Sequence, residues 1–312
     1  MSLVEQALRR MRQSGRGGMA TAVPAGSLRT AEPFARLVSI PRDVTAPDAP
    51  WPPPGRVIAV NQAGLRAAGL LPPEHQERQL AQQYRQIKRP LVASALGKGV
   101  PQIPNGHLIM VASALPGEGK TFMSINLAFS LAAERDLRIL LVDADVAKPH
   151  ISRLFGLDDE PGLLDALRDE SIEIESLVIP TEIPGLFVLP AGRPTEHATE
   201  LLASARMDAL TRDIGHRDPS RVVLFDSPPL LMTTESQVLA QAVGQIVVVV
   251  RAGKTTQQEL ESALSFLADR PAVSLVLNQS VSADRSGYYY HGYGYGYGQQ
   301  RDAANLGPQL PV

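Results

Sequence analysis

The sequence predicts an α/β fold in which helices flank a doubly wound, mostly parallel β-sheet. Short apolar runs of strand length recur between residues 108 and 278, and most are continuous rather than alternating, as is typical of parallel strands covered on both faces. Helix-like stretches separate these runs, which is the order of a βα repeat. The composition agrees, because 44% of the residues are hydrophobic and 20% are charged, as in ordinary globular proteins.

Two segments are predicted to precede the folded domain. Residues 1–16 are predicted to form an amphipathic helix, because Ser2 and Glu5 are spaced as in a capping box and apolar residues follow at helical spacing. This Arg-rich helix either packs on its own domain or docks on a partner or an anionic membrane surface. Residues 17–55 are rich in Pro, Ala and Gly and are predicted to be a linker.

The folded domain is predicted to span residues 56–282, and its sheet is built from six apolar runs. These strand candidates are residues 108–113, 138–143, 186–192, 221–226, 245–250 and 273–278. Residues 283–312 are polar and of low complexity, so they are predicted to be a disordered tail. The fold is thus expected to have disordered segments at both termini.

Charge and cysteine content exclude several classes of function. The net charge of −2 argues against a general nucleic-acid binder. The absence of cysteine excludes disulfides, thiolate metal sites and iron–sulfur clusters. No apolar run is long enough for a membrane span, and no signal peptide is recognisable, so we expect a cytoplasmic protein.

A phosphate-binding loop is predicted at residues 112–121 (ASALPGEGKT), which follow a strand candidate and precede a helix. Gly117 and Gly119 let backbone N–H groups face phosphate oxygens, while Lys120 would neutralise the β- and γ-phosphates. Ala114 replaces the usual first glycine, so we expect that position not to need a positive φ. The loop predicts a P-loop NTPase-like fold that binds ATP through Pro116, Gly117, Glu118, Gly119, Lys120, Thr121 and Phe122.

Three aspartates are predicted to meet beside this loop. Asp143 and Asp145 stand at the carboxyl end of one strand candidate, and Asp226 ends another. In open α/β sheets ligands bind at these strand ends. Converging carboxylates repel one another unless a cation joins them, so we expect Mg²⁺ there, with Thr121 as a further ligand.

These motifs, in this order, resemble the bacterial tyrosine kinases of polysaccharide export. The resemblance rests on PGEGKT, VDADVAKPH, DSPP and the tyrosine cluster near the end of the chain. It is strongest to the exosortase-associated (PEP-CTERM type) tyrosine autokinases of exopolysaccharide biosynthesis, through MSLVEQAL, RLFGL, LPAGR, TELLAS and LVLNQ. It covers most of the chain and is weakest over residues 13–55.

The resemblance implies roles for individual residues. Lys120 and Thr121 would bind phosphates and Mg²⁺, and Asp145 and Asp226 would hold Mg²⁺ directly or through water. Asp143 would orient or deprotonate the attacking phenol. Asn278 lies where relatives contact adenine; it could instead simply end a strand.

The resemblance also implies partners. In relatives a Glu-x-x-Arg-x-x-Arg helix mediates ring-shaped self-association, and the corresponding positions here are Gln82, Arg85 and Lys88. No transmembrane activator is fused to this sequence, so we expect a membrane-bound polysaccharide co-polymerase as a separate partner at the inner membrane. A tyrosine phosphatase is expected as well, and nucleic acid is not.

Six of the seven tyrosines lie in the Gly-rich tail, where they cannot pack: Tyr288, Tyr289, Tyr290, Tyr293, Tyr295 and Tyr297. Beside an ATP site, this cluster is predicted to be the phosphoacceptor, reached more easily in trans than in cis. The alternative for the tail is a sticky low-complexity segment without chemistry. For the whole chain the alternatives are a partitioning-type ATPase switch, whose second loop lysine is Leu115 here, and a non-catalytic ATP-binding scaffold.

Overall fold

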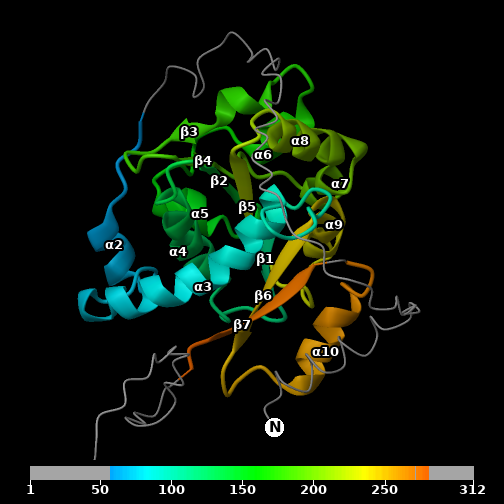
Figure 1. The fold of residues 1–312 in the computed structure, drawn as a ribbon. Coiled ribbons are helices and arrows are strands. Elements are labelled where there is room, and N and C mark those ends of the chain that lie inside the picture. Colours follow the sequence, from blue (N-terminus) through cyan, green and yellow to red (C-terminus); the bar gives the residue numbers. More distant parts are fainter. Residues whose placement is uncertain (1–56, 271, 281–312) are drawn as a thin grey trace, which may run out of the picture. The chain divides into compact units, whose positions relative to one another are not determined.

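The computed structural model describes residues 57–270 and 272–280 (Figure 1). These residues belong to a compact unit that ends at Ser280. The predicted N-terminal helix, the linker and the tyrosine tail lie outside the described residues.

In the described part of the chain, seven strands form one sheet in the order β3-β4-β2-β5-β1-β6-β7. All neighbours are parallel except the β3–β4 pair, which is antiparallel. The strands are β1 (Leu108–Ser113), β2 (Arg138–Asp143), β3 (Ile179–Pro180), β4 (Leu186–Leu189), β5 (Arg221–Asp226), β6 (Gln245–Arg251) and β7 (Val273–Asn278).

The predicted α/β class and mostly parallel sheet are therefore confirmed, with small differences in detail, such as β6 ending one residue later than predicted. β4 ends at Leu189 rather than at residue 192, because Pro190 has no N–H to continue the ladder. β3 was not predicted, since it is only two residues long and carries no periodic signal.

Helices cover both faces of the sheet, as Figure 1 shows with α2–α5 on one side and α6–α10 on the other. On the first side are α2 (Gln62–Ala67), the 3₁₀ helix η1 (Glu74–Gln76), α3 (Glu77–Leu96), α4 (Lys120–Ala132) and α5 (His150–Leu154). On the second are α6 (Leu163–Arg168), η2 (Ile174–Leu177), α7 (Ala198–Leu202), α8 (Ala205–His216), α9 (Thr234–Ala242) and α10 (Gln257–Ser265).

The central strands are buried on both faces, which explains their continuous apolar sequences. Alternate residues of β1 enter different core clusters: Met110 packs in the one beneath α6–α10, and Ile109 in the one beneath α2–α5. Tyr84 of α3 also lies in the second cluster, and burial raises the pKa of its phenol. Tyr84 is thus a core residue.

The strand order positions the predicted site. β2, β5 and β1 are adjacent and parallel, so their carboxyl ends meet at one edge of the sheet. Asp143 is directly paired with Asp226 in the β2–β5 register. The phosphate loop follows β1 at the same edge.

Candidate active site

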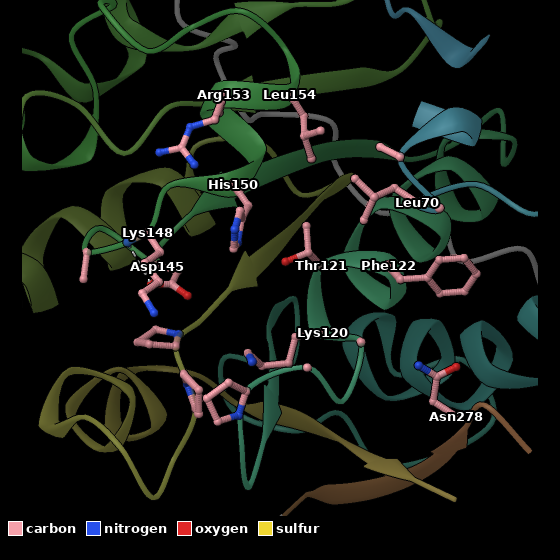
Figure 2. A pocket seen from close by; sticks show the side chains of 18 of the residues that line it. Leu70, Lys120, Thr121, Phe122, Asp145, Lys148, His150, Arg153, Leu154 and Asn278 are labelled. Carbon is pink, nitrogen blue, oxygen red and sulfur yellow. Dashed lines mark hydrogen bonds between the residues drawn. The ribbon is translucent and has the colours of Figure 1, made fainter. Parts of the chain in front are cut away.

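The carboxyl ends of these strands border a cavity of about 790 Å³. Figure 2 shows Lys120 and Thr121 at the start of α4, Asp145 and Lys148 after β2, and Asn278 at the end of β7. Of the predicted site residues, those that line it are Pro116, Gly117, Gly119, Lys120, Thr121, Phe122, Asp145 and Asn278. Glu118, Asp143 and Asp226 lie behind this lining and are buried.

The loop between β1 and α4 has the geometry expected of a phosphate site. Gly117 and Gly119 have positive φ values of 78° and 99°, which glycine adopts without a Cβ penalty. Gly119 is also the residue that caps α4 at its N-terminus, where unpaired N–H groups and the helix dipole favour an anion. Ala114 is not among the described residues with positive φ, so alanine fits there without backbone strain.

Glu118 braces the loop from behind rather than facing the cavity. One of its carboxylate oxygens accepts a hydrogen bond from the Leu115 N–H at 2.8 Å, and the other accepts one from the Thr255 hydroxyl. Thr255 follows β6, so this side chain ties the loop to the neighbouring strand. The contribution of Glu118 to nucleotide binding would then be to hold the loop in its shape.

Asn278 contacts the same loop. Its Nδ2 donates to the Glu118 carbonyl at 2.9 Å, and a Cβ added to Gly119 would lie 2.1 Å from that Nδ2. The positive φ therefore favours glycine at position 119, and a larger residue there would also force the Asn278 side chain to move. Asn278 also lines the cavity. Its contact with adenine stays a prediction.

Asp226 is held by two hydroxyl groups of α4. Thr121 donates to Oδ2 and Ser124 donates to Oδ1, each at 2.8 Å. Burial raises the pKa of Asp226 to about 6, although these hydrogen bonds and the Lys120 charge oppose the shift. The pairing of Thr121 with Asp226 is the arrangement in which P-loop proteins hold Mg²⁺ beside a nucleotide.

Asp143 is fully buried and only half satisfied. Its Oδ2 accepts hydrogen bonds from the Ser152 N–H at 2.7 Å and from the Ser152 hydroxyl at 2.8 Å. Its Oδ1 is buried and has no hydrogen-bond partner among the described residues. Burial raises the pKa of Asp143 to about 7, and the charges of Asp226 and Asp145 raise it further against the Ser152 hydrogen bonds.

Asp145 is the carboxylate of the three that faces the cavity. Burial raises its pKa, whereas Lys120 is the strongest influence that lowers it. Burial lowers the pKa of Lys120 below its usual value, and the charges of Asp226 and Asp145 oppose that shift. The loop lysine and the three aspartates thus form one electrostatic cluster, and the three aspartates meet beside the loop as their places at strand ends predicted.

The cluster fits Mg²⁺ bound together with a nucleotide rather than alone. Among residues 57–270 and 272–280, no group of three or more His, Asp or Glu side chains could hold a metal by itself. Mg²⁺ commonly takes only one or two protein carboxylates and completes its shell with phosphates and water. The unpartnered Asp143 Oδ1 and the Thr121–Asp226 pair supply the polar groups that such an ion, or its water, requires.

Three supporting residues were not foreseen from the sequence. Ser124 lies one turn after Thr121 on α4, so helical spacing could have indicated it. Ser152 and Thr255 reach Asp143 and Glu118 through the tertiary fold, and no local pattern marks them.

Lys88, which corresponds to a position of the ring-forming helix in relatives, is used internally. It is only 7% exposed. Its Nζ donates to the Ser130 carbonyl and pairs with Glu134, each at 2.6 Å. This side chain therefore joins α3 to the end of α4 and is not free for a contact between subunits.

No described helix is long and apolar enough to cross a membrane.

Comparison with known proteins gives consistent matches. A family profile described as an AAA domain matches residues 106–270. The chain is 33% identical over 159 residues to the tyrosine-protein kinase ptk of Acinetobacter johnsonii, covering 51% of this chain and 21% of ptk. It is 29% identical over 214 residues to the tyrosine-protein kinase YwqD of Bacillus subtilis, covering 68% of this chain and 86% of YwqD.

The solved kinase domain of VpsO is also similar, with 30% identity and a TM-score of 0.53. That match covers 65% of this chain and 98% of the VpsO domain. The chain spans about a fifth of the length of ptk and of similarly long relatives.

Proposed function

The chain belongs to the bacterial tyrosine-kinase family, and from this premise we propose that it is an ATP-dependent protein-tyrosine autokinase. The observation that carries the proposal is the cavity in which Lys120 and Thr121 meet Asp145. The cavity is thus lined by a phosphate-binding loop and by a carboxylate that can meet an incoming hydroxyl (Figure 2). The proposed acceptors are Tyr288, Tyr289, Tyr290, Tyr293, Tyr295 and Tyr297.

In the proposed reaction the phenol oxygen of a tail tyrosine attacks the γ-phosphorus of ATP. The bond between that phosphorus and the β–γ bridging oxygen breaks, ADP leaves, and the phenol proton passes to a carboxylate. Asp143 is the proposed group that orients or accepts this proton, with Ser152 holding its other oxygen. Asp145 lines the open cavity. Asp143 and Asp145 are therefore substituted one at a time, to find which carboxylate accepts the phenol proton.

Magnesium, when bound, would neutralise charge on the β- and γ-phosphates, with Thr121, Asp145 and Asp226 as its proposed holders. The protein's own groups then supply orientation. Lys120 would contact the transferred phosphoryl group, and the loop N–H groups would hold the phosphates in line with the phenol.

The acceptor is proposed to come from another copy of the chain. Tyr84, the one tyrosine among the described residues, is buried in the core. β7 ends at Asn278, at the edge of the sheet that bears the cavity. The 15 residues from Asn278 to Tyr293 span ~20 Å if flexible, and this is the reach proposed for entering the site of a neighbouring copy.

The biological setting is proposed from the family alone. The kinase would regulate polymerisation or export of an exopolysaccharide, at the cytoplasmic side of the inner membrane. It would self-associate, require a membrane-bound co-polymerase protein for activation, and be reset by a tyrosine phosphatase. The subtype proposed is the exosortase-associated one.

The test is a phosphotyrosine assay on the purified full chain with Mg²⁺ and ATP. We expect a signal that disappears in Lys120→Met and in a truncation after Ser286, and that persists in Lys98→Met, a matched exposed lysine outside the cavity. Membrane fractions containing the co-polymerase are added in a parallel arm. Phosphotyrosine that survives Lys120→Met would contradict the proposed site.

Two other functions would be favoured by other outcomes. ATP hydrolysis without phosphotyrosine, with the membrane arm included, would favour a partitioning-type switch. ATP binding without hydrolysis or transfer would favour a scaffold.

A further inference from the structure

Three basic residues line the side of the cavity that carries Asp145, where the proposed acceptor would enter. Lys148, His150 and Arg153 belong to the segment that runs from Asp145 into α5, and all three line the cavity and are exposed. Figure 2 shows Lys148 and His150 near Asp145 and Arg153 beyond His150, all across the cavity from Asn278. We call these three residues the basic rim. It is separate in sequence from Lys120, which serves the nucleotide phosphates.

The rim's charge is little neutralised within the described part of the chain. Of the three residues, Arg153 has a carboxylate partner, Asp158, but the distance is 3.6 Å and both side chains are well exposed. Such a surface pair contributes little and is easily exchanged. Asp145, the one acidic residue among those that line the cavity, also interacts with Lys148 and His150, so it offsets one unit of the positive charge. The acceptor side therefore has positive charge to offer to an anion.

The tyrosine-bearing part of the unmodified tail does not provide that anion. Residues 287–300, which contain all six acceptor tyrosines, include no aspartate or glutamate. Each phosphorylation adds a charge of about −1.5 to −2 and three strong acceptor oxygens. The tail thus becomes complementary to the rim only after a first tyrosine has been phosphorylated.

The tyrosine spacing suits such a contact. Tyr293, Tyr295 and Tyr297 alternate with glycine, so in an extended chain neighbouring tyrosines are about 7 Å apart on the same side. A lysine or arginine side chain that starts beside the acceptor tyrosine is long enough to reach the neighbouring tyrosine. His150 and Arg153, three residues apart on α5, project from the same side of the helix.

We propose that the basic rim is a subsite for a phosphotyrosine next to the acceptor tyrosine, so that the tail is phosphorylated successively. The first transfer is slow, and each later one is accelerated by the phosphate already present. Every transfer follows the reaction written above, and only the neighbouring residue differs. This proposal rests on the proposed kinase function and defines its preferred acceptor.

The test uses the full chain with its six tail tyrosines changed to phenylalanine, so that only added peptides accept phosphate. The peptides have the sequence of residues 286–300 with Tyr295 as the single acceptor and phenylalanine at the other tyrosines. One carries phosphotyrosine at 297, one carries it at 293, and one carries none. We expect kcat/KM for at least one primed peptide to exceed the unprimed value about tenfold, as for one exposed charge-assisted contact.

Variants identify the source of that preference. Lys148→Gln and Arg153→Gln should lower the ratio of primed to unprimed kcat/KM towards one, whereas the matched surface variants Lys98→Gln and Arg212→Gln should keep it. An equal rate on all peptides, or a preference that the rim variants leave intact, would overturn the proposal. A raised KM for ATP with an unchanged ratio would assign the rim to nucleotide phosphates instead.

A second measurement follows the unaltered tail by intact mass during autophosphorylation. Successive transfer predicts few singly phosphorylated chains in the wild type and their accumulation in Lys148→Gln. Equal distributions in both proteins would also overturn the inference. A complete absence of phosphotyrosine in every arm would instead refute the kinase function on which it rests.

Discussion

Strand β5 carries a buried charge at each end, and the two ends differ in how that charge is balanced. At the amino end, Arg221 contacts both carboxylate oxygens of Glu175, at 2.5 and 3.2 Å, and donates to the Ile214 carbonyl. At the carboxyl end, Asp226 lies in a cluster with two further carboxylates and one buried lysine. Burial raises the pKa values of Asp226 and Asp143 there to about 6 and about 7.

The difference separates a structural charge from a functional one. A buried arginine that contacts both oxygens of its carboxylate partner keeps its geometry without any ligand. A cluster of partly satisfied carboxylates is costly in the free protein and gains stability only when a cation and its phosphates arrive. We therefore expect substitutions at the two ends to change stability in opposite directions.

The largest effect is expected at the amino end. Glu175→Gln should lower the free energy of unfolding by about 3 kcal/mol, because it leaves the Arg221 charge buried without its counter-ion. Urea denaturation of the nucleotide-free protein measures this. Glu173→Gln is the matched control: Glu173 pairs with Arg217 at the surface, where loss of a pair costs less than about 1 kcal/mol. Similar losses in both variants would remove the contrast between buried and exposed pairs.

At the carboxyl end of β5 we expect substitution to increase the free energy of unfolding. Asp143→Asn should raise the free energy of unfolding of the nucleotide-free protein by about 1 kcal/mol, as site residues often trade stability for function. The amide is neutral, so it avoids the cost of a buried charge, and its oxygen can still accept from Ser152.

The same variant should lose most of the thermal stabilisation that the wild type gains from Mg²⁺ and ATP. Asp158→Asn, an exposed aspartate nearby in sequence, serves as the control and should retain that gain. A destabilised Asp143→Asn protein would mean that this carboxylate is structural, like Glu175.

A smaller effect, the dependence of stability on pH, is expected from the amino end of the sheet. His107 precedes β1 there, and its Nε2 is buried without a hydrogen-bond partner among the described residues. Its ring centroid lies 5.3 Å from that of His216. Burial lowers the pKa of His107, and the His216 charge lowers it further.

Because the pKa of His107 is lower in the folded state, the unfolded chain binds protons first as the pH falls. The stability contributed by neutral His107 should be complete above the unfolded value of about 6.5 and decline below it, towards the folded pKa. Urea denaturation between pH 7.5 and 5.5 measures the slope, and His216→Gln should make it shallower. An unchanged slope in His216→Gln would show that other groups dominate the acid response.

The sequence by itself determined the fold class and marked the loop and the strand-end aspartates of the candidate site. Continuous apolar runs mark strands that are buried on both faces, because a strand with one face in water would alternate apolar and polar residues. Gly117 and Gly119 mark the loop, because a positive φ is a local property that selects glycine. Aspartates at the ends of parallel strands must share one edge of the sheet.

Only the tertiary structure decided how each of these groups is satisfied. Asp143 and Asp145 are two residues apart and look equivalent in sequence, yet one is fully buried against Ser152 and the other faces the cavity. Arg221 finds its counter-ion 46 residues away, and Asn278 reaches the loop from 160 residues away. Burial and hydrogen-bond partners depend on residues brought together by folding, and a local pattern contains no information about them.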